Sequence, residues 1–366
     1  MRIVDRYIFR EYGLHLFYCV LALAMVFVVY DLFGHLGTFL EARTPVHLIG
    51  YFYVCMLAQA MEFLLPASLL LATLYTLWHM TRHNEFTAMR ACGISMLRLM
   101  SPFLMVGVAA SLCTAAVKEG FAPEASLWAS EFARAKFRET RGTTYEDVAY
   151  YNTLNHRVWL IGKVNSLKPN ILMRVTIIQD RPDGTRAWAL RAKDVMYLDG
   201  QWWVNDVTEV QLFDERGNPL KTAIPWKDPS MPRELRFLNE RPSELLAELR
   251  PWEFLSSADI ARYLSCHPGL SGEAITDRKF DLHSRLAMPW ACLVVTLFGV
   301  PAGARCGRQS PLGGLFMALV FFFAYYLLIH VGVFVGKRGI VEPWLGAWLP
   351  NGASLAAGVL MLFRLR

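Results

Sequence analysis

The 366-residue sequence lacks the signatures of several large classes of protein. It contains no phosphate-binding loop of the form G-x-x-x-x-G-K followed by Ser or Thr, which excludes a nucleotide-hydrolysing site of that type within this chain. No run of Lys or Arg is interleaved with aromatic residues, so the net charge of +6 does not indicate nucleic-acid binding. Internal repeats and low-complexity segments are also missing.

The residues that usually build catalytic or metal centres are few and scattered. Of the seven cysteines only Cys266 lies in the long polar segment, so neither a disulfide framework nor a cysteine-based metal site is expected. His79 and His83 are four residues apart, but no carboxylate or third ligand accompanies them in the sequence. Ser256-Ser257 lacks the context of a nucleophile elbow. We therefore expect no enzymatic activity, no bound cofactor and no metal site in this chain.

Long apolar stretches are the dominant feature that is present. Hydrophobic residues make up 54% of the chain and the mean hydropathy is +0.29. A helix needs about 20 apolar residues to cross a bilayer core of about 30 Å. Six stretches qualify, with prolines that neighbouring helices can accommodate: 14–37, 51–79, 97–118, 285–305, 311–335 and 344–363.

The distribution of basic residues predicts how these spans are oriented. Ten Lys or Arg residues lie in short segments on one side and three on the other. Since cytoplasmic loops carry the excess of positive charge, both termini are expected in the cytoplasm. The first span runs past 20 residues without a small-x-small site after it, so we expect it to be retained and not cleaved.

The segment between the third and fourth spans has the pattern of a folded β domain. Short β-rich runs occur at 158–161, 175–178 and 202–204, and Asp183-Gly184 and Asp199-Gly200 read as hairpin turns. A sandwich, jelly roll or open barrel is predicted over about 145–240, with helices at 121–138 and 252–264. The expected fold is an α-helical integral membrane protein, with three helices in 1–120, an inserted β domain in 121–283 and three helices in 284–366.

The segment 82–95 predicts a short helix at the membrane surface between the second and third spans. Residues 85–92 contain no helix breaker, and Gly93 supplies a stop. Such a helix would offer Glu85 and Arg90 to another protein. Two simpler interpretations remain open: Glu85 gains about 0.3–1 kcal/mol from the helix dipole, and Arg90 meets lipid phosphates.

Three motifs together resemble the LptF/LptG permeases, the membrane subunits of the lipopolysaccharide export transporter. They are Val4-Asp5-Arg6-Tyr7-Ile8, the segment Asn84–Ser95, and Leu282-His283-Ser284-Arg285-Leu286-Ala287-Met288-Pro289. Gly299-Val300-Pro301-Ala302-Gly303 and Trp348-Leu349-Pro350-Asn351 are similar to the same family. The resemblance covers nearly the whole chain, and Asp5-Arg6-Tyr7 favours the G-type member slightly.

The resemblance implies a heterodimer with a second, paralogous six-helix permease in the bacterial inner membrane. A dimer of cytoplasmic ATPase subunits would power it, with ATP and Mg bound there and not by this chain. The pair would extract lipopolysaccharide and pass it through a periplasmic β-jellyroll to a bridge protein leading to the outer membrane. By the same resemblance Glu85 meets a basic pocket on the ATPase, and spans one and five form a lateral gate.

Several charged residues near the predicted spans are candidates for the lipid cavity or gate. Glu62 lies mid-depth, where an ionisable group costs about 2.5–3.5 kcal/mol on insertion scales, so it should face protein or a wet cavity, either lining the lipid path or serving as a structural hydrogen-bonded group. Asp31 and His35 lie one turn apart, where the resemblance leads us to expect lysine; they could pair with the partner permease or a divalent cation, or simply snorkel. Arg43 and Lys118 could still meet lipid phosphate.

The aromatic and β-branched residues of the β domain fit two interpretations. Ile177, Trp202 and Val204 could line an interior that passes acyl chains, or they could be ordinary core. Trp202 and Trp203 are adjacent, so in a strand one points inward and the other outward.

Two other functions fit parts of this pattern. A sensory or mechanotransmitting membrane protein would read a ligand outside and signal through the short helix, but it would need no lipid cavity. An integral-membrane lipid-modifying enzyme would need an intramembrane cluster of His, Asp or Glu, which the sequence does not show.

Overall fold

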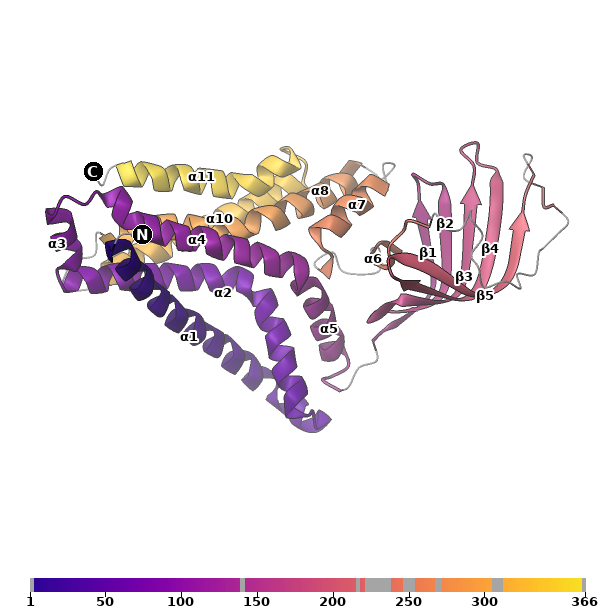
Figure 1. Ribbon diagram of the computed structural model, residues 1–366, viewed down its shortest axis with the longest axis horizontal. Helices are drawn as coiled ribbons and strands as arrows, with labels where there is room; N and C mark the ends of the chain where they lie inside the picture. Colours follow the sequence, from indigo (N-terminus) through magenta and orange to yellow (C-terminus); the bar gives the residue numbers. More distant parts are fainter. Residues whose placement is uncertain are drawn as a thin grey trace. The chain divides into compact units, whose positions relative to one another are not determined.

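A computed structural model describes residues 3–138, 142–214, 218–220, 238–245, 254–266, 272–304 and 312–363. The chain divides into two compact units (Figure 1). The helical unit comprises Met1–Ala125 with Gly272–Arg366, and the sheet unit comprises Ser126–Ser271. Five of the arginines that predict the orientation lie outside the described residues: Arg2, Arg305, Arg308, Arg364 and Arg366.

The helical unit is built from long helices in the order that the hydropathy predicts. They are α1 (Ile3–Ala42), α2 (Val46–Arg82), α3 (Glu85–Ala91), α4 (Met96–Gly120), α8 (Gly272–Ala287), the 3-10 turn η3 (Met288–Trp290), α9 (Ala291–Ala304), α10 (Leu312–Lys337) and α11 (Pro343–Phe363). Within the described residues, five segments are long and apolar enough to cross a membrane: Ile3–Ala42, Val46–Arg82, Arg98–Gly120, Ile275–Pro301 and Leu319–Lys337. The sixth predicted span coincides with α11, which is not among these five, so the count of six stays a prediction.

The helices that contain the first and fourth predicted spans extend beyond them. Helix α1 begins at Ile3 and not at residue 14, because the charged residues before the apolar stretch continue the same helix. The fourth predicted span, 285–305, overlaps the candidate segment Ile275–Pro301, within which a 3-10 turn breaks the α-helix. Helix α8 starts at Gly272, and η3 interrupts it at Pro289, which has no N–H to donate to the helical ladder.

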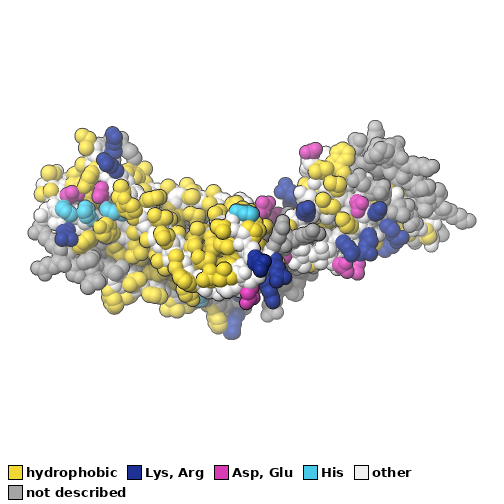
Figure 2. Space-filling view, turned by 90° about the horizontal axis from the view of Figure 1, so that it is seen from below, with side chains coloured by type: hydrophobic (Ala, Val, Ile, Leu, Met, Phe, Trp, Pro, Cys, Tyr) yellow, Lys and Arg dark blue, Asp and Glu magenta, His cyan; other side chains and the backbone are white. Residues whose placement is uncertain are grey.

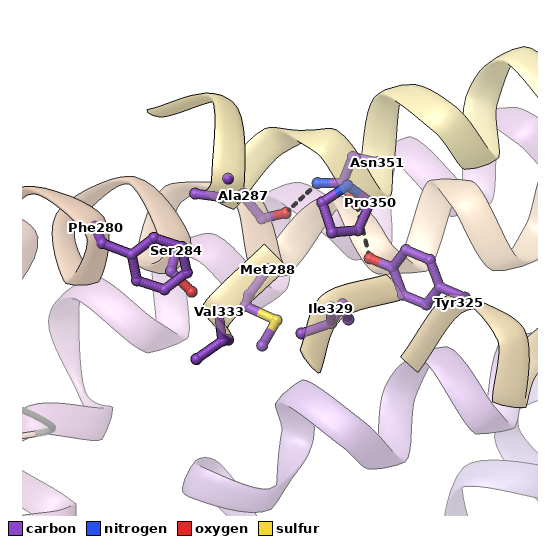
Figure 3. Close-up of a pocket in the computed structure, with 11 residues that line it drawn as sticks. Phe280, Ser284, Ala287, Met288, Tyr325, Ile329, Val333, Pro350 and Asn351 are labelled. Atoms are coloured by element: carbon purple, nitrogen blue, oxygen red, sulfur yellow. Dashed lines mark hydrogen bonds between the residues drawn. The ribbon is translucent and has the colours of Figure 1, made fainter. Parts of the chain in front are cut away.

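The interruption at η3 is fixed to two other helices by side chains. The Asn351 side-chain amide donates a hydrogen bond of 2.8 Å to the carbonyl oxygen of Ala287, at the end of α8. The Tyr325 hydroxyl on α10 donates one of 2.7 Å to the Asn351 carbonyl oxygen (Figure 3). The break is therefore a defined joint that α10 and α11 hold, beside a small pocket that includes Phe280 and Met288.

The outer surface of the helical unit is largely apolar. Many large hydrophobic side chains on α1 are exposed, including Phe17 at 64%, Tyr30 at 82% and Phe33 at 74%. Figure 2 shows hydrophobic side chains over much of the face of this unit seen from below. Inside the unit, α10 and α11 approach so closely that a Cβ at Gly332 would clash with the carbonyl oxygen of Gly346. Small residues at such crossings are typical of helices that pack within a membrane.

The sheet unit contains one antiparallel sheet among its described residues, with the strands in chain order β1-β2-β3-β4-β5. Its elements are β1 (Thr144–Asn152), β2 (Arg157–Asn165), β3 (Lys168–Asp180), β4 (Arg186–Leu198), β5 (Gln201–Leu212), α6 (Pro242–Leu245) and α7 (Ser257–Cys266), and α5 (Ala122–Arg134) precedes them. The predicted turns at Asp183-Gly184 and Asp199-Gly200 are confirmed as the connections β3–β4 and β4–β5. The sequence also predicts a turn at Arg216-Gly217-Asn218-Pro219, of which Arg216 and Gly217 lie outside the described residues.

A crease crosses the sheet where the inward residues change phase. In a regular strand, successive inward side chains are two positions apart in the sequence. In four neighbouring strands one step is three positions: Tyr145 to Val148, Ile161 to Val164, Leu172 to Val175, and Ala192 to Val195. The pairing skips the row Asp147–Gly162–Arg174–Lys193 that lies between them. Asp147 and Arg174 there have positive φ, 52° and 55°, and a Cβ at Gly162 would lie 2.7 Å from that of Arg174. Because each strand skips one residue at this row, the inward side shifts by one position from one flank of the row to the other.

The inward face of the sheet forms a packed core that the segment 238–245 completes. Trp159, Ile177 and Trp202 are at most 1% exposed, and Leu238 and Leu245 belong to the same cluster. Glu240, in the same segment, is buried against the sheet. Its carboxylate accepts hydrogen bonds from the Arg157 guanidinium at 2.9 and 3.2 Å and from the Asn152 amide at 3.0 Å.

Candidate functional site

Helix α3 (Glu85–Ala91) is a short element that lies between α2 and α4, with a tight turn at each end. Asn84 enters it with a left-handed φ of 59°, and Gly93 leaves it with a φ of 81°. The N–H of Ile94 bonds to the carbonyl of Met89 and that of Gly93 to Arg90, which is the pattern of a glycine-capped C-terminus. The predicted stop at Gly93 is therefore confirmed.

One face of α3 is anchored in the helical unit and the other is open. Phe86 is 8% exposed and packs in the cluster that contains Ile8, Met80 and Leu99. Arg90 is exposed, as is Cys92 at the end of the helix. Glu85 is half-buried. The two residues predicted to face another protein therefore differ, since Arg90 is free to solvent and Glu85 is held against the rest of the unit.

Glu85 meets a line of polar residues on α1, which we call the α1 polar line: Tyr7, Glu11 and His15, spaced one turn apart. The Tyr7 hydroxyl donates a hydrogen bond of 2.8 Å to Glu85 Oε2. Glu11 Oε1 lies 3.9 Å from the Nε2 atoms of both His15 and His79. The i, i+4, i+8 spacing on α1 is visible in the sequence, but its partners on α2 and α3 are not.

Two of the predicted cavity residues form an ion pair with each other. Lys118 Nζ on α4 lies 2.8 Å from Glu62 Oε2 on α2, and the two side chains are 18% and 19% exposed. This pairing favours the structural hydrogen-bonded interpretation of Glu62 in this conformation. It also means that Lys118 already has a counter-charge before any lipid phosphate arrives.

Asp31 and His35 also interact within the chain. His35 Nδ1 lies 3.3 Å from Asp31 Oδ2, and the Tyr53 hydroxyl on α2 donates to the same oxygen at 3.1 Å. Arg43 lies elsewhere, exposed in the turn between α1 and α2 with a φ of 50°. The structure thus brings Asp31 and His35 together, brings Glu62 and Lys118 together, and places Arg43 in the turn between α1 and α2.

The three residues predicted to line the β domain lie on the packed face of the sheet. Ile177 and Trp202 are buried in its core and Val204 packs against it. The Trp202 indole N–H donates to the backbone carbonyl of Glu240 at 2.6 Å. Trp203 is 51% exposed, so the expectation that the two tryptophans point to opposite faces is confirmed.

Electrostatic perturbations in the sheet unit come from burial and from charge pairing. Burial raises the pKa of the Cys266 thiol and that of the Tyr150 phenol. The hydrogen bond to Glu244 raises the pKa of Arg262. In the part of the chain that the structure describes, no group of three or more His, Cys, Asp or Glu side chains could hold a metal ion. Arg262 Nη1 lies 2.8 Å from Glu244 Oε1, so this perturbation comes from an ion pair within the sheet unit.

Comparison with known proteins gives one match that spans nearly the whole chain. Residues 6–364 match the family described as lipopolysaccharide export system permease LptF/LptG. No curated protein matches the chain in a sequence search. The family match includes α3, the α1 polar line, the η3 joint and the sheet. The chain therefore belongs to the LptF/LptG family of lipopolysaccharide export permeases.

Proposed function

We propose that this chain is one of two membrane-embedded permease subunits of an ABC-type exporter that extracts lipopolysaccharide from the inner membrane. ATP hydrolysis would reside in a cytoplasmic dimer of ATPase subunits. The second permease would be a paralogous six-helix chain, and a periplasmic bridge protein would receive the lipid. The family match supports the transport of lipopolysaccharide, and the partners are inferred from it.

The observation that carries the coupling role is the construction of α3. A seven-residue helix with one anchored face and tight turns at both ends lies between two candidate membrane spans. If a partner protein holds the open face of such a helix, any rotation is transmitted to α2 and α4 because the anchored face cannot slip. We assign Glu85 and Arg90 as the residues that meet the ATPase, with Glu85 supplying the charge for a basic pocket.

The proposed topology places both termini and α3 in the cytoplasm and the sheet unit in the periplasm. The excess of basic residues beside the N-terminus and α3 supports it. The hydrogen bond between Tyr7 and Glu85 adds a second argument, since it requires the start of α1 and α3 to lie on the same side of the membrane. In this arrangement 1–120 and 284–366 are the two helical halves around the inserted domain 121–283.

We place the lipid path near the Glu62–Lys118 ion pair. Both side chains are partly exposed and both lie within candidate spans, so a headgroup phosphate can approach Lys118 and compete with Glu62. Arg43 would meet phosphate at the outer surface, while Asp31 and His35 on α1 would border the gate. The sheet unit is proposed as a jellyroll, with Ile177, Trp202 and Val204 facing the acyl chains once the interior opens.

Co-purification from native membranes tests this proposal. The tagged wild-type chain should recover an ATPase subunit and a second six-span permease. Glu85→Lys should lose the ATPase, because it places a cation against the basic pocket, and should retain the permease. Lys163→Glu reverses one charge in the sheet unit, far in sequence from α3, and should change neither.

Two results would contradict the proposal in different ways. Recovery of the ATPase with Glu85→Lys at the wild-type level would remove the role of Glu85. Failure to recover any ATPase, in a detergent that preserves other transporters, would favour the sensory function over transport.

A further inference from the structure

We propose that Tyr7 is a positioning residue that holds the Glu85 carboxylate for its partner and joins α3 to α1. This inference rests on the proposed role of Glu85 in binding the ATPase. Tyr7 lies in the N-terminal motif that carries the family resemblance, but neither the sequence nor the family match assigns it a role.

The geometry of the contact leaves Glu85 able to bind a second group. The Tyr7 hydroxyl occupies Oε2 at 2.8 Å. A carboxylate offers about four lone-pair sites on two oxygens, and no other hydrogen bond to Glu85 is found within the described residues. Tyr7 is neutral, so it fixes the rotamer of Glu85 without cancelling its charge. An incoming cation therefore meets a full negative charge that is already oriented.

Orientation before binding has a direct effect on affinity. An unrestrained glutamate loses rotamer freedom when it docks, and holding it in place beforehand removes part of that cost. The backbone around Glu85 is constrained in the same way, by the left-handed Asn84 before it and by the buried Phe86 after it. Tyr7 completes this arrangement by fixing the side chain.

The same hydrogen bond connects α3 to a firmly attached part of α1. One turn beyond Tyr7, Glu11 faces His79 on α2. Two turns beyond Tyr7, His15 Nδ1 lies 3.0 Å from the hydroxyl of Thr76, also on α2. The Tyr12 hydroxyl lies 3.0 Å from that of Thr73. A displacement of Glu85 is thus passed to α1 through Tyr7, and α1 carries it along α2.

A double-mutant cycle on the assembled complex tests this inference. The permease pair is placed in nanodiscs and titrated with labelled ATPase subunit, for wild type, Tyr7→Phe, Glu85→Gln and the double variant. Tyr7→Phe should weaken binding about three- to tenfold, which is the order expected for one partly exposed hydrogen bond to a charged group. In the Glu85→Gln background the same change should cost less than about twofold, since Tyr7 acts through the charge of Glu85.

A matched control uses the same chemical change on the same helix. Tyr18→Phe also removes one phenolic hydroxyl from α1, at a side chain that is 57% exposed, and should bind like wild type. Lipopolysaccharide released from proteoliposomes per ATP hydrolysed should fall with Tyr7→Phe, with the KM for ATP unchanged, because the nucleotide site itself is untouched.

Each alternative outcome has a distinct meaning. An equal loss with Tyr7→Phe in both backgrounds would reduce Tyr7 to a packing residue, and wild-type binding or tighter binding would also overturn the inference. If Glu85→Gln itself binds the ATPase like wild type, the proposed coupling role fails first. If Glu85→Gln weakens binding and Tyr7→Phe does not, only the role of Tyr7 is lost.

Discussion

The two units bury charged side chains in different ways. In the sheet unit the Glu240 side chain is fully buried, and it accepts hydrogen bonds from Arg157 and Asn152. In the helical unit the Glu62 carboxylate meets Lys118, and about a fifth of each side chain remains exposed. A sealed carboxylate with several donors has no vacancy for a ligand. A pair whose side chains stay about one-fifth exposed can exchange partners with an incoming anion.

Under the proposed function, this difference would separate the structural charge at Glu240 from a functional charge at Glu62 and Lys118. Desolvating an ion costs several kcal/mol, and the cost is recovered only where geometry and additional hydrogen bonds are good. The sheet unit meets that condition at Glu240. Glu62 does not need such a network of hydrogen bonds if a transported phosphate replaces it as the partner of Lys118 during the transport cycle. Four substitutions probe the comparison.

Glu240→Ala is expected to have the largest effect. It leaves the Arg157 guanidinium, 8% exposed, buried without its carboxylate, which costs about 3–5 kcal/mol. Urea unfolding of the full chain in detergent, followed by tryptophan fluorescence, should show the sheet-unit transition at a lower midpoint, since Trp159 and Trp202 lie in that core. An unchanged midpoint would mean that the segment 238–245 contributes little to holding the sheet.

Glu62→Gln should have an effect of intermediate size, and it should strengthen the binding of lipid and not weaken the fold. It removes the charge that competes for Lys118, so binding of bisphosphorylated lipid A to the permease pair in nanodiscs should strengthen by roughly three- to tenfold. Lys118→Gln should weaken it. Equal binding by wild type and Glu62→Gln would show that lipid phosphate does not reach Lys118. The Glu62–Lys118 pair would then be structural, like the Glu240 site.

Glu146→Gln should have the smallest effect and should depend on pH. The hydrogen bond and charge of Lys163, 2.7 Å away, hold the pKa of this exposed carboxyl below its ordinary value of 4.5. A lowered pKa in the folded state stabilises the fold above pH 4.5, and this contribution is lost as the pH falls through the folded value. The small difference in Tm between wild type and variant should therefore shrink as the pH is lowered, and also at high salt. A difference that does not shrink as the pH is lowered would have another cause.

Local features of the structure could be predicted from the sequence, and distant pairings could not. Gly93 ends α3 and Asp199-Gly200 turns a hairpin because each depends on the backbone of a few neighbouring residues. Strand β4 was harder to see, because Arg191 and Lys193 on its outer face dilute its apolar pattern. The contacts that define the candidate site, Tyr7 with Glu85 and Glu62 with Lys118, join residues of different helices. No periodicity within one helix specifies which neighbour its polar face will meet.

The crease across the sheet sets a rule for any strand that extends it. The strands make their three-position step at the same row. The backbone pairing skips that row and resumes beyond it, so apolar side chains face inward on both flanks. A strand added beside β1 or β5 that kept strict alternation would present apolar residues inward on one flank and polar residues on the other. A chain able to continue this sheet must therefore carry the same three-residue step in its own sequence, and that step is a pattern by which such chains can be searched for.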